Sequence, residues 1–171
     1  MANWDIRKGL MAVFEGVLLA SNQYHFETLW RVQATIDEVS DILAQPLCLP
    51  RWWPQVYLSV RETEPGVYAL HTKGWLPYHL TWKFHVVESR PPYGFKLHAW
   101  GDLEGTGVWK FVQNGDYADV HYDWTVNATK PILRYLSCAL KPIFSANHRW
   151  AMARGYESLL KELARRRSAL K

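Results

Sequence analysis

Large apolar side chains alternate with polar ones along most of the middle of the chain, and this alternation constrains the fold more than any other feature. Between residues 24 and 34, for example, Phe26, Trp30 and Val32 are each followed by a polar or charged residue or a small one. A period of two places one set of side chains on one face of a strand, so the segment is predicted to be a half-buried β-strand.

Six more segments show strand patterns, and short turns separate several of them. The expected strands cover 55–63, 67–73, 78–86 and 95–99, a segment bearing Trp109 and Phe111, and a segment from Val120 to Val126. Glu64-Pro65-Gly66 and Asn114-Gly115-Asp116 are predicted turns, and the second is typical of a hairpin. Gly101, Gly105 and Gly107 can supply bulges or bends. We therefore expect an antiparallel sheet of six to seven strands that curls.

Helical patterns flank the strands. Thr35 followed by Glu38 forms a capping-box pattern that predicts a short helix ending before Pro46, and 47–53 is predicted to form a second helical turn. A 3.6-residue apolar period after Thr129 predicts a long C-terminal helix to about residue 166. Pro142 lies inside it and predicts a kink or break.

The first 22 residues carry a different apolar pattern. Ile6, Leu10, Val13, Phe14, Val17 and Leu18 follow helical spacing, which predicts an amphipathic N-terminal helix over 1–22. Glu15 interrupts the apolar run, which is too short to span a bilayer, so neither a signal peptide nor stable membrane insertion is expected. The helix is expected to pack on the domain or on a second copy of the chain, the latter giving a homodimer.

Composition limits the class of protein. With 171 residues, 49% hydrophobic and 21% charged, the chain fits one globular domain over 23–167. Arg165, Arg166, Arg167 and Lys171 could account for the net charge of +4, so no nucleic-acid partner is expected. Cys48 and Cys138 lack zinc-site spacing and are interpreted as free thiols in a reducing cytoplasm, so we expect a cytoplasmic protein without metal.

Several stretches together resemble a known superfamily. They are Trp30-Arg31-Val32-Gln33-Ala34 running into Ile36-Asp37-Glu38-Val39, Arg51-Trp52-Trp53-Pro54, the stretch 101–109, and Asn147-His148, Met152, Gly155 and Leu159 on the last helix. With the element order, they resemble the START-like superfamily with its helix-grip fold, and in particular its polyketide cyclase/dehydrase and lipid-transport branch. The resemblance covers roughly 24–166 and implies an α+β fold with an apolar tunnel between a curved sheet and the C-terminal helix. Members bind lipids, sterols, aromatic polyketides or hormones, and the fold alone does not select a reaction.

The candidate ligand-binding residues share the apolar parity of their strands or the inward face of the last helix. They are Tyr57, Trp82, Phe84, Leu97, Trp109, Phe111, Tyr122, Trp124, His148 and Met152. The alternative is an ordinary core in which the same rings interdigitate. His148 is interpreted either as a ligand contact and acid or base, or as a structural histidine bonded within the protein. His71 is a further polar candidate whose face the pattern does not fix.

Two motifs have two interpretations each. Arg51-Trp52-Trp53-Pro54 forms either a mouth for the cavity or a turn held by two indoles, and Gly155 is expected to permit close approach of the helix rather than room for a ligand.

Three functions follow from these observations. The first is binding of a hydrophobic small molecule, lipid-like or aromatic, without a cofactor. The second is a polyketide cyclase-type enzyme in which His148 or a tyrosine moves a proton. The third is an interaction module that docks through the N-terminal helix. The chain has no Ser-His-Asp order, HExxH, Walker loop or GxGxxG that would support common hydrolase, metalloprotease or nucleotide-binding functions.

Overall fold

The computed structural model describes residues 11–15, 23–128 and 131–169, with 11–15, 128 and 131–141 described as backbone only. The strands are β1 (Met11–Glu15), β2 (Gln23–Val32), β3 (Tyr57–Glu64), β4 (Val67–Lys73), β5 (His79–Arg90), β6 (Gly94–Gly101), β7 (Leu103–Asn114) and β8 (Tyr117–Ala128). The helices are α1 (Ile36–Leu43), the 3₁₀ turn η1 (Pro46–Cys48), α2 (Leu49–Trp52) and α3 (Pro131–Ser168).

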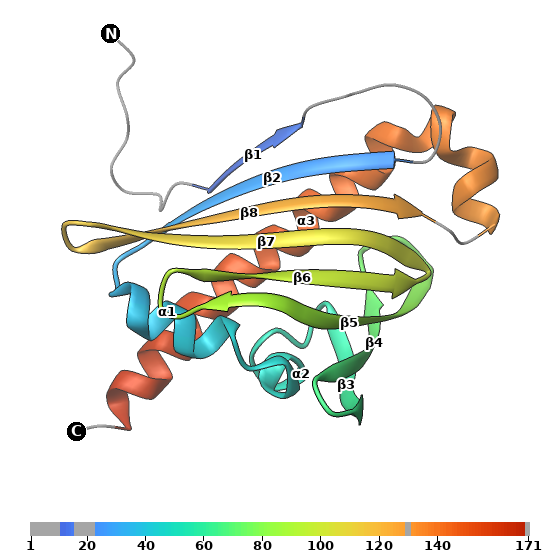
Figure 1. The fold of residues 1–171 in the computed structure, drawn as a ribbon. Coiled ribbons are helices and arrows are strands. Elements are labelled where there is room, and N and C mark those ends of the chain that lie inside the picture. Colours follow the sequence, from blue (N-terminus) through green and yellow to red (C-terminus); the bar gives the residue numbers. More distant parts are fainter. Residues whose placement is uncertain (1–10, 16–22, 129–130, 170–171) are drawn as a thin grey trace, which may run out of the picture.

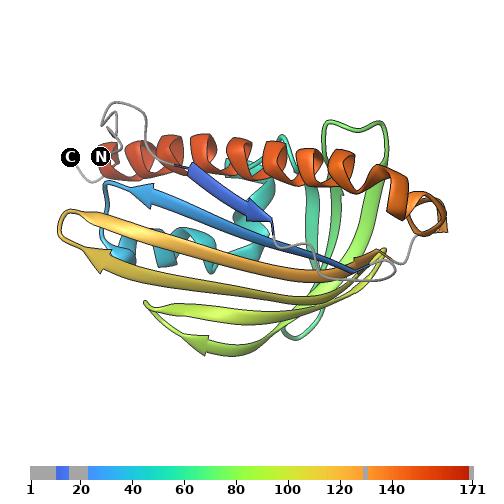
Figure 2. The same ribbon diagram turned by 90° about the horizontal axis from the view of Figure 1, so that it is seen from above.

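The strands form one antiparallel sheet in the order β1-β2-β8-β7-β6-β5-β4-β3. Figure 1 shows this sheet curving, and Figure 2 shows α3 lying along its concave side. The predicted α+β helix-grip fold is confirmed, and each of the seven expected strands is present as β2 to β8. Val120 and Trp124 on β8 and Phe111 on β7 are buried on the face toward α3, as their parity predicted.

The prediction of an N-terminal helix is wrong for Met11–Glu15, the part of this segment that the structure describes. Residues Met11–Glu15 form β1, which pairs antiparallel with β2 from Met11 opposite Trp30 to Glu15 opposite Phe26. A short apolar run fits both helical and strand periods, and the edge of β2 offers unpaired backbone groups that favour a strand. The remaining residues of the predicted stripe, including Ile6, lie outside the described residues. A homodimer through this segment stays a prediction.

The two short helical segments after β2 are confirmed, and the first begins as its sequence predicted. The Thr35 side chain accepts a hydrogen bond from the Glu38 amide at 3.2 Å, while the Thr35 amide donates to Glu38 Oε2 at 2.9 Å. Arg167, near the end of α3, also donates to Glu38 Oε1 at 2.7 Å. The capping box therefore fixes both the start of α1 and its position beside the last turns of α3.

α3 is a single helix of 38 residues that contains Pro142. Both views show its first turns, in orange, bent away from the rest of the helix. A bend without a break agrees with the expectation of a kink or break, because proline removes one backbone donor and crowds the preceding turn. The straight part of α3 crosses the sheet and buries Met152, Leu159 and Leu163. In the described part of the chain, no helix combines the length and apolar character needed to cross a membrane.

Candidate ligand-binding site

A cavity of about 150 Å³ lies between the concave face of the sheet and α3. We call it the inner cavity. Seven of the ten candidate residues line it, namely Tyr57, Trp82, Trp109, Tyr122, Trp124, His148 and Met152. The side chains between sheet and helix therefore leave space that an interdigitated core would have filled. Ligand binding by these residues stays a prediction.

The other three candidates lie elsewhere. Phe84 and Leu97 line a second, smaller space of about 100 Å³, which we call the distal pocket. Phe111 lines neither space, and its buried ring packs against Phe95 and Trp109 with centroid distances of 6.3 and 6.5 Å. Correct strand parity therefore placed all three on the inner face, but parity does not determine how far along the face the cavity extends.

Sequence reasoning missed several residues of the inner cavity. Tyr24, Phe26, Tyr78, Leu80 and Phe144 line it, together with Trp53. Tyr24 and Phe26 had the same strand parity as the accepted candidates, so that signal would have found them. Trp53 had no such signal, because it lies between α2 and β3 and reaches the cavity only through tertiary packing.

His148 faces the cavity from α3. Its ring stacks on Phe26 with centroids 4.2 Å apart and planes 15° from parallel. Burial, and then the nearby charge of Arg149, lower its pKa to about 3, so the imidazole is neutral near pH 7. Nε2 is buried and has no hydrogen-bond partner in the described part of the chain. A buried polar atom without a partner costs about 1–3 kcal/mol, which a ligand could recover.

Tyr57 and Tyr122 place two phenols at the floor of the inner cavity. Tyr122 stacks on Trp109 with centroids 4.0 Å apart, and Tyr57 packs edge-on against Trp53 at 5.1 Å. Burial raises the pKa of both phenols, and that of Tyr122 is raised further by the neighbouring Tyr57 and Asp123. Both therefore stay protonated and can donate hydrogen bonds.

A glycine makes room for Tyr122. A Cβ atom at Gly107 would lie 3.1 Å from the Tyr122 hydroxyl oxygen and 3.0 Å from the indole of Trp124. The absent side chain therefore leaves space for both rings, a role the sequence analysis had assigned only to backbone bending.

Trp53 lies under α3 because of Gly155. A Cβ atom at Gly155 would come within 2.3 Å of Trp53 Cζ2, so the glycine makes room for this indole. Trp53 Nε1 is buried without a hydrogen-bond partner among the described residues, whereas Trp82 Nε1 donates to Thr72 Oγ1 at 3.0 Å. Both Trp52 and Trp53 are buried, so the motif they share forms a packed turn, and Trp53 also supplies cavity wall.

The β4–β5 connection borders the inner cavity next to α3. Asn147 Oδ1 accepts hydrogen bonds from the Trp75 and Leu76 amides at 2.9 and 3.3 Å. Gly74 accommodates this side chain, since a Cβ atom there would lie 2.0 Å from Asn147 Oδ1. Exposed Lys73 is the one charged residue among the described residues of the lining, which favours neutral or anionic ligands over cations.

Tyr78 is the last residue of the same connection and adds a third protonated phenol. Its pKa is raised to about 12, first by burial and then by the nearby Tyr24.

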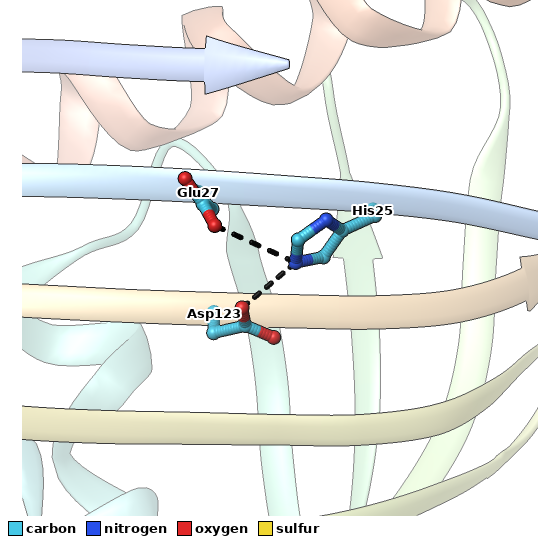
Figure 3. Close-up of side chains that lie close together, drawn as sticks. All are labelled: His25, Glu27 and Asp123. Atoms are coloured by element: carbon cyan, nitrogen blue, oxygen red, sulfur yellow. Dashed lines mark hydrogen bonds and ion pairs between the residues drawn. The ribbon is translucent and has the colours of Figure 1, made fainter. Parts of the chain in front are cut away.

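The opposite face of the sheet carries the one cluster of metal-ligand type found among the described residues (Figure 3). His25 Nε2 lies 2.7 Å from Asp123 Oδ2 and 4.0 Å from Glu27 Oε1. The three ligand atoms lie within 4.8 Å of one another, so they could hold a cation. These residues alternate with cavity-lining Tyr24, Phe26 and Trp124, and the cluster is therefore separated from the inner cavity by the sheet.

His71 belongs to that outer face as well. Its neighbours Leu70 and Thr72 are buried on the inner face, and its Nε2 lies 3.0 Å from Nδ1 of His79. The candidate histidine of uncertain parity is therefore not part of the cavity wall.

Comparisons with known proteins identify the fold. No family model matches the chain, and no curated protein matches it in sequence. Among solved structures, a conserved protein from Geobacillus kaustophilus has a TM-score of 0.64 and 16% identity, covering 82% of this chain and 95% of that one. The Zhui aromatase/cyclase from a Streptomyces species has a TM-score of 0.61 and 17% identity, covering 84% and 95%.

A third similar structure is the di-domain aromatase/cyclase StfQ of the steffimycin biosynthetic pathway. Its TM-score is 0.60 at 20% identity, and the match covers 86% of this chain and 52% of StfQ. At these identities the similarity shows a shared helix-grip fold and does not transfer activity or residue roles.

Proposed function

We propose that this protein binds a small, ring-bearing molecule with oxygen acceptors in the inner cavity. The observation that carries the proposal is a lining of aromatic rings that includes polar atoms without protein partners. Trp53 Nε1 and His148 Nε2 are both buried in this state within the described residues. Buried polar atoms in native proteins are almost always hydrogen-bonded, so an acceptor from a ligand is the expected partner.

The protonation states of the lining favour binding over proton transfer. His148, with a pKa of about 3, is neutral near pH 7. The neutral imidazole accepts a proton poorly, and it carries no extra proton to donate as an acid. Tyr78, with a pKa of about 12, is likewise a weak acid. An efficient general acid or base needs a pKa close to the working pH. These side chains are therefore suited to hydrogen bonding and ring contact.

A matched pair of probes tests this function. 2-Naphthol and naphthalene have the same rings, but only the first carries a hydroxyl group. Both should quench indole fluorescence saturably, and 2-naphthol should bind more tightly. His148→Leu should weaken 2-naphthol about fivefold, the equivalent of one hydrogen bond, and leave naphthalene unchanged.

The control for this experiment is His121→Leu, which alters an exposed histidine of β8 outside the cavity lining. It should change neither affinity. Failure of both probes to bind the wild-type protein would overturn the proposal, and an equal loss for both probes in His148→Leu would assign the imidazole a packing role only.

A polyketide cyclase-type reaction is the second candidate, because similar structures include aromatase/cyclases. Ring closure joins an enol carbon to a ketone carbon, and aromatisation then releases water. A cavity of this kind would fold the reacting chain, and the protonated phenols of Tyr57 and Tyr122 would hydrogen-bond the ketone oxygens.

Product analysis separates the two candidates. A synthetic poly-β-ketone thioester should give one dominant cyclised product with the wild-type protein, and the spontaneous mixture with a Tyr57→Phe/Tyr122→Phe variant. An identical mixture with and without wild-type protein would remove the enzymatic candidate and leave the binding function intact.

A further inference from the structure

The inner cavity and the distal pocket have part of their walls in common. Five aromatic residues line both spaces: Trp53, Tyr57, Trp82, Trp109 and Tyr122. We call these five rings the aromatic partition. The two spaces are therefore neighbours that meet at the same five residues.

We propose that the distal pocket is a second subsite for the same ligand, reached by displacement of the Tyr57 ring, and that the ligand is an elongated molecule with an uncharged apolar end. This inference rests on the proposed binding function. It adds the shape of the ligand and the residue that controls access to the second subsite.

Volume supports an elongated ligand. The inner cavity of about 150 Å³ matches, in size, an engineered protein cavity that holds one benzene molecule. The distal pocket adds space of about 100 Å³, enough for a short alkyl chain or part of a second ring. A ligand confined to the inner cavity would be limited to a compact group such as one ring or two fused rings, whereas a ligand that extends across the partition could be considerably longer.

The lining of the distal pocket determines which end of a ligand it can accept. Outside the partition, its wall is formed by the segment from α1 to α2 and by strands β5 and β6. The first of these contributes Leu43, Ala44 and Leu49. Among the described residues, Ser89 is the one polar side chain in that part of the wall, and none of the lining residues is charged. A charged group would find no opposite charge among these residues to replace its hydration, so a hydrocarbon or aromatic end of the ligand suits this lining best.

Tyr57 is the member of the partition with the fewest restraints. Trp82 is held by its hydrogen bond to Thr72, and Tyr122 lies between Trp109 and Trp124 at 4.0 and 6.0 Å. Tyr57 has one close ring neighbour, Trp53. It begins the edge strand β3, where the pairing register with β4 shifts between Tyr57 and Ser59. Rotation of this ring would therefore disturb the fewest contacts.

A series of 4-alkylphenols from 4-ethylphenol to 4-octylphenol tests the inference, because the head group stays constant. For the wild-type protein, affinity should increase about fourfold for each methylene that becomes buried, and the increase should continue beyond two carbons. Ala44→Trp, at an exposed residue on the rim of the distal pocket, should retain 4-ethylphenol affinity and stop the increase for longer chains.

Two further variants complete the experiment. Ala164→Trp, at an exposed residue of α3 outside both linings, should follow the wild-type series. Tyr57→Ala should accelerate association of 4-octylphenol more than that of 4-ethylphenol. If no alkylphenol binds, the proposed function fails. If 4-ethylphenol binds but the series is flat in the wild type, or rises equally in Ala44→Trp, the second subsite is refuted.

Discussion

The two halves of α3 contact the rest of the protein in different ways. From Gly155 onward, polar side chains are bonded to the segments around α1 and α2. Glu162 accepts a hydrogen bond from Arg51 at 2.8 Å, and Ser158 donates to Gln55 at 3.2 Å. The Tyr156 hydroxyl donates to the backbone carbonyl of residue 31 at 3.0 Å. This half of the helix is therefore tied to the protein by directed polar bonds.

Before Gly155, the described side chains of α3, from residue 142 onward, contact the sheet mainly through rings. Phe144 meets Tyr24 and Tyr78 edge-on at 5.9 and 6.4 Å, and His148 stacks on Phe26. The buried Nε2 of His148 has no partner among the described residues. Directed polar bonds to the rest of the protein are therefore concentrated at one end of the helix, and ring contacts with the cavity wall at the other, which is the division expected of a rigid scaffold that supports a binding site.

The largest loss of stability is expected from Gly155→Val. Its side chain would begin 2.3 Å from the buried Trp53 indole, which cannot retreat without disturbing Trp30 and Trp52. We expect a loss of about 3 kcal/mol in the free energy of unfolding, measured by urea denaturation. Ala164→Val, at an exposed site of the same helix, should cost about 0.5 kcal/mol. Equal midpoints for the two variants would contradict this account of Gly155.

Glu162→Gln tests the polar bonds of the same half. Glu162 Oε1 and Oε2 accept hydrogen bonds from Arg51, Arg165 and Arg166 at 2.7–2.9 Å. The carboxylate is 4% exposed, but it is covered largely by guanidinium groups that remain in contact with water, so its effect is moderated by solvent. We expect a loss of about 2 kcal/mol at pH 7. Glu157→Gln, in a more exposed pair with Arg154, should lose less than about 0.5 kcal/mol.

The same variant has a defined pH dependence. Hydrogen bonds from Arg165 lead the interactions that lower the pKa of Glu162 from an ordinary value of 4.5 to about 2 in the folded protein. Its contribution is therefore present above pH 4.5 and lost as the pH falls toward 2. The stability curves of Glu162→Gln and wild type should converge in that range, and a constant difference down to pH 2 would refute the assignment.

The fold followed from the sequence wherever one pattern dominated. Two-residue alternation located seven strands, and the Thr35–Glu38 capping box located the start of α1. The prediction failed at Met11–Glu15, because a five-residue apolar segment satisfies helical and strand spacing equally well. Pairing with β2 determined that the segment is a strand, since the edge of β2 could accept one there.

The site was predictable only in part. Parity placed Trp82, Trp109 and Trp124 on the cavity face correctly. It could not show that Trp53 would enter the cavity wall or that its Nε1 would lack a partner, because both depend on how closely α3 approaches the sheet. Gly155 gave the signal for that approach, but its neighbour is an indole from the α2–β3 connection, which periodicity does not identify.

The stability contribution of His148, in the half of α3 before Gly155, should depend on pH in a different range from that of Glu162. The folded-state pKa of His148 is about 3, against an ordinary value of 6.5, mainly because the ring is buried. Below pH 6.5 the unfolded chain binds a proton that the folded protein does not, so wild-type stability should fall by up to about 1.4 kcal/mol per pH unit as the pH decreases toward 3. His148→Leu should remove this slope and be more stable than wild type at pH 5.

Chemical denaturation of both proteins from pH 7.5 to pH 4 measures this effect. His121→Leu, which alters an exposed histidine, serves as the control and should keep the wild-type slope. Parallel curves for wild type and His148→Leu would mean that the imidazole takes up its proton in the folded state and does not remain buried and neutral.

The smallest effect is expected at the border of the cavity, from Asn147→Ala. Asn147 Oδ1 accepts from the Trp75 and Leu76 amides, and these bonds tie the β4–β5 connection to α3. Loss of one net hydrogen bond should cost about 1 kcal/mol locally and raise amide exchange of Trp75 and Leu76 about fivefold, with exchange in β8 unchanged.

A substitution at Gly74 makes this test more specific, because a Cβ atom there would overlap the Asn147 side chain. Gly74→Ala should therefore destabilise the wild type but be tolerated when combined with Asn147→Ala. If the double variant is as unstable as the sum of the single ones, the two residues do not share this contact, and the connection is held to α3 by other means.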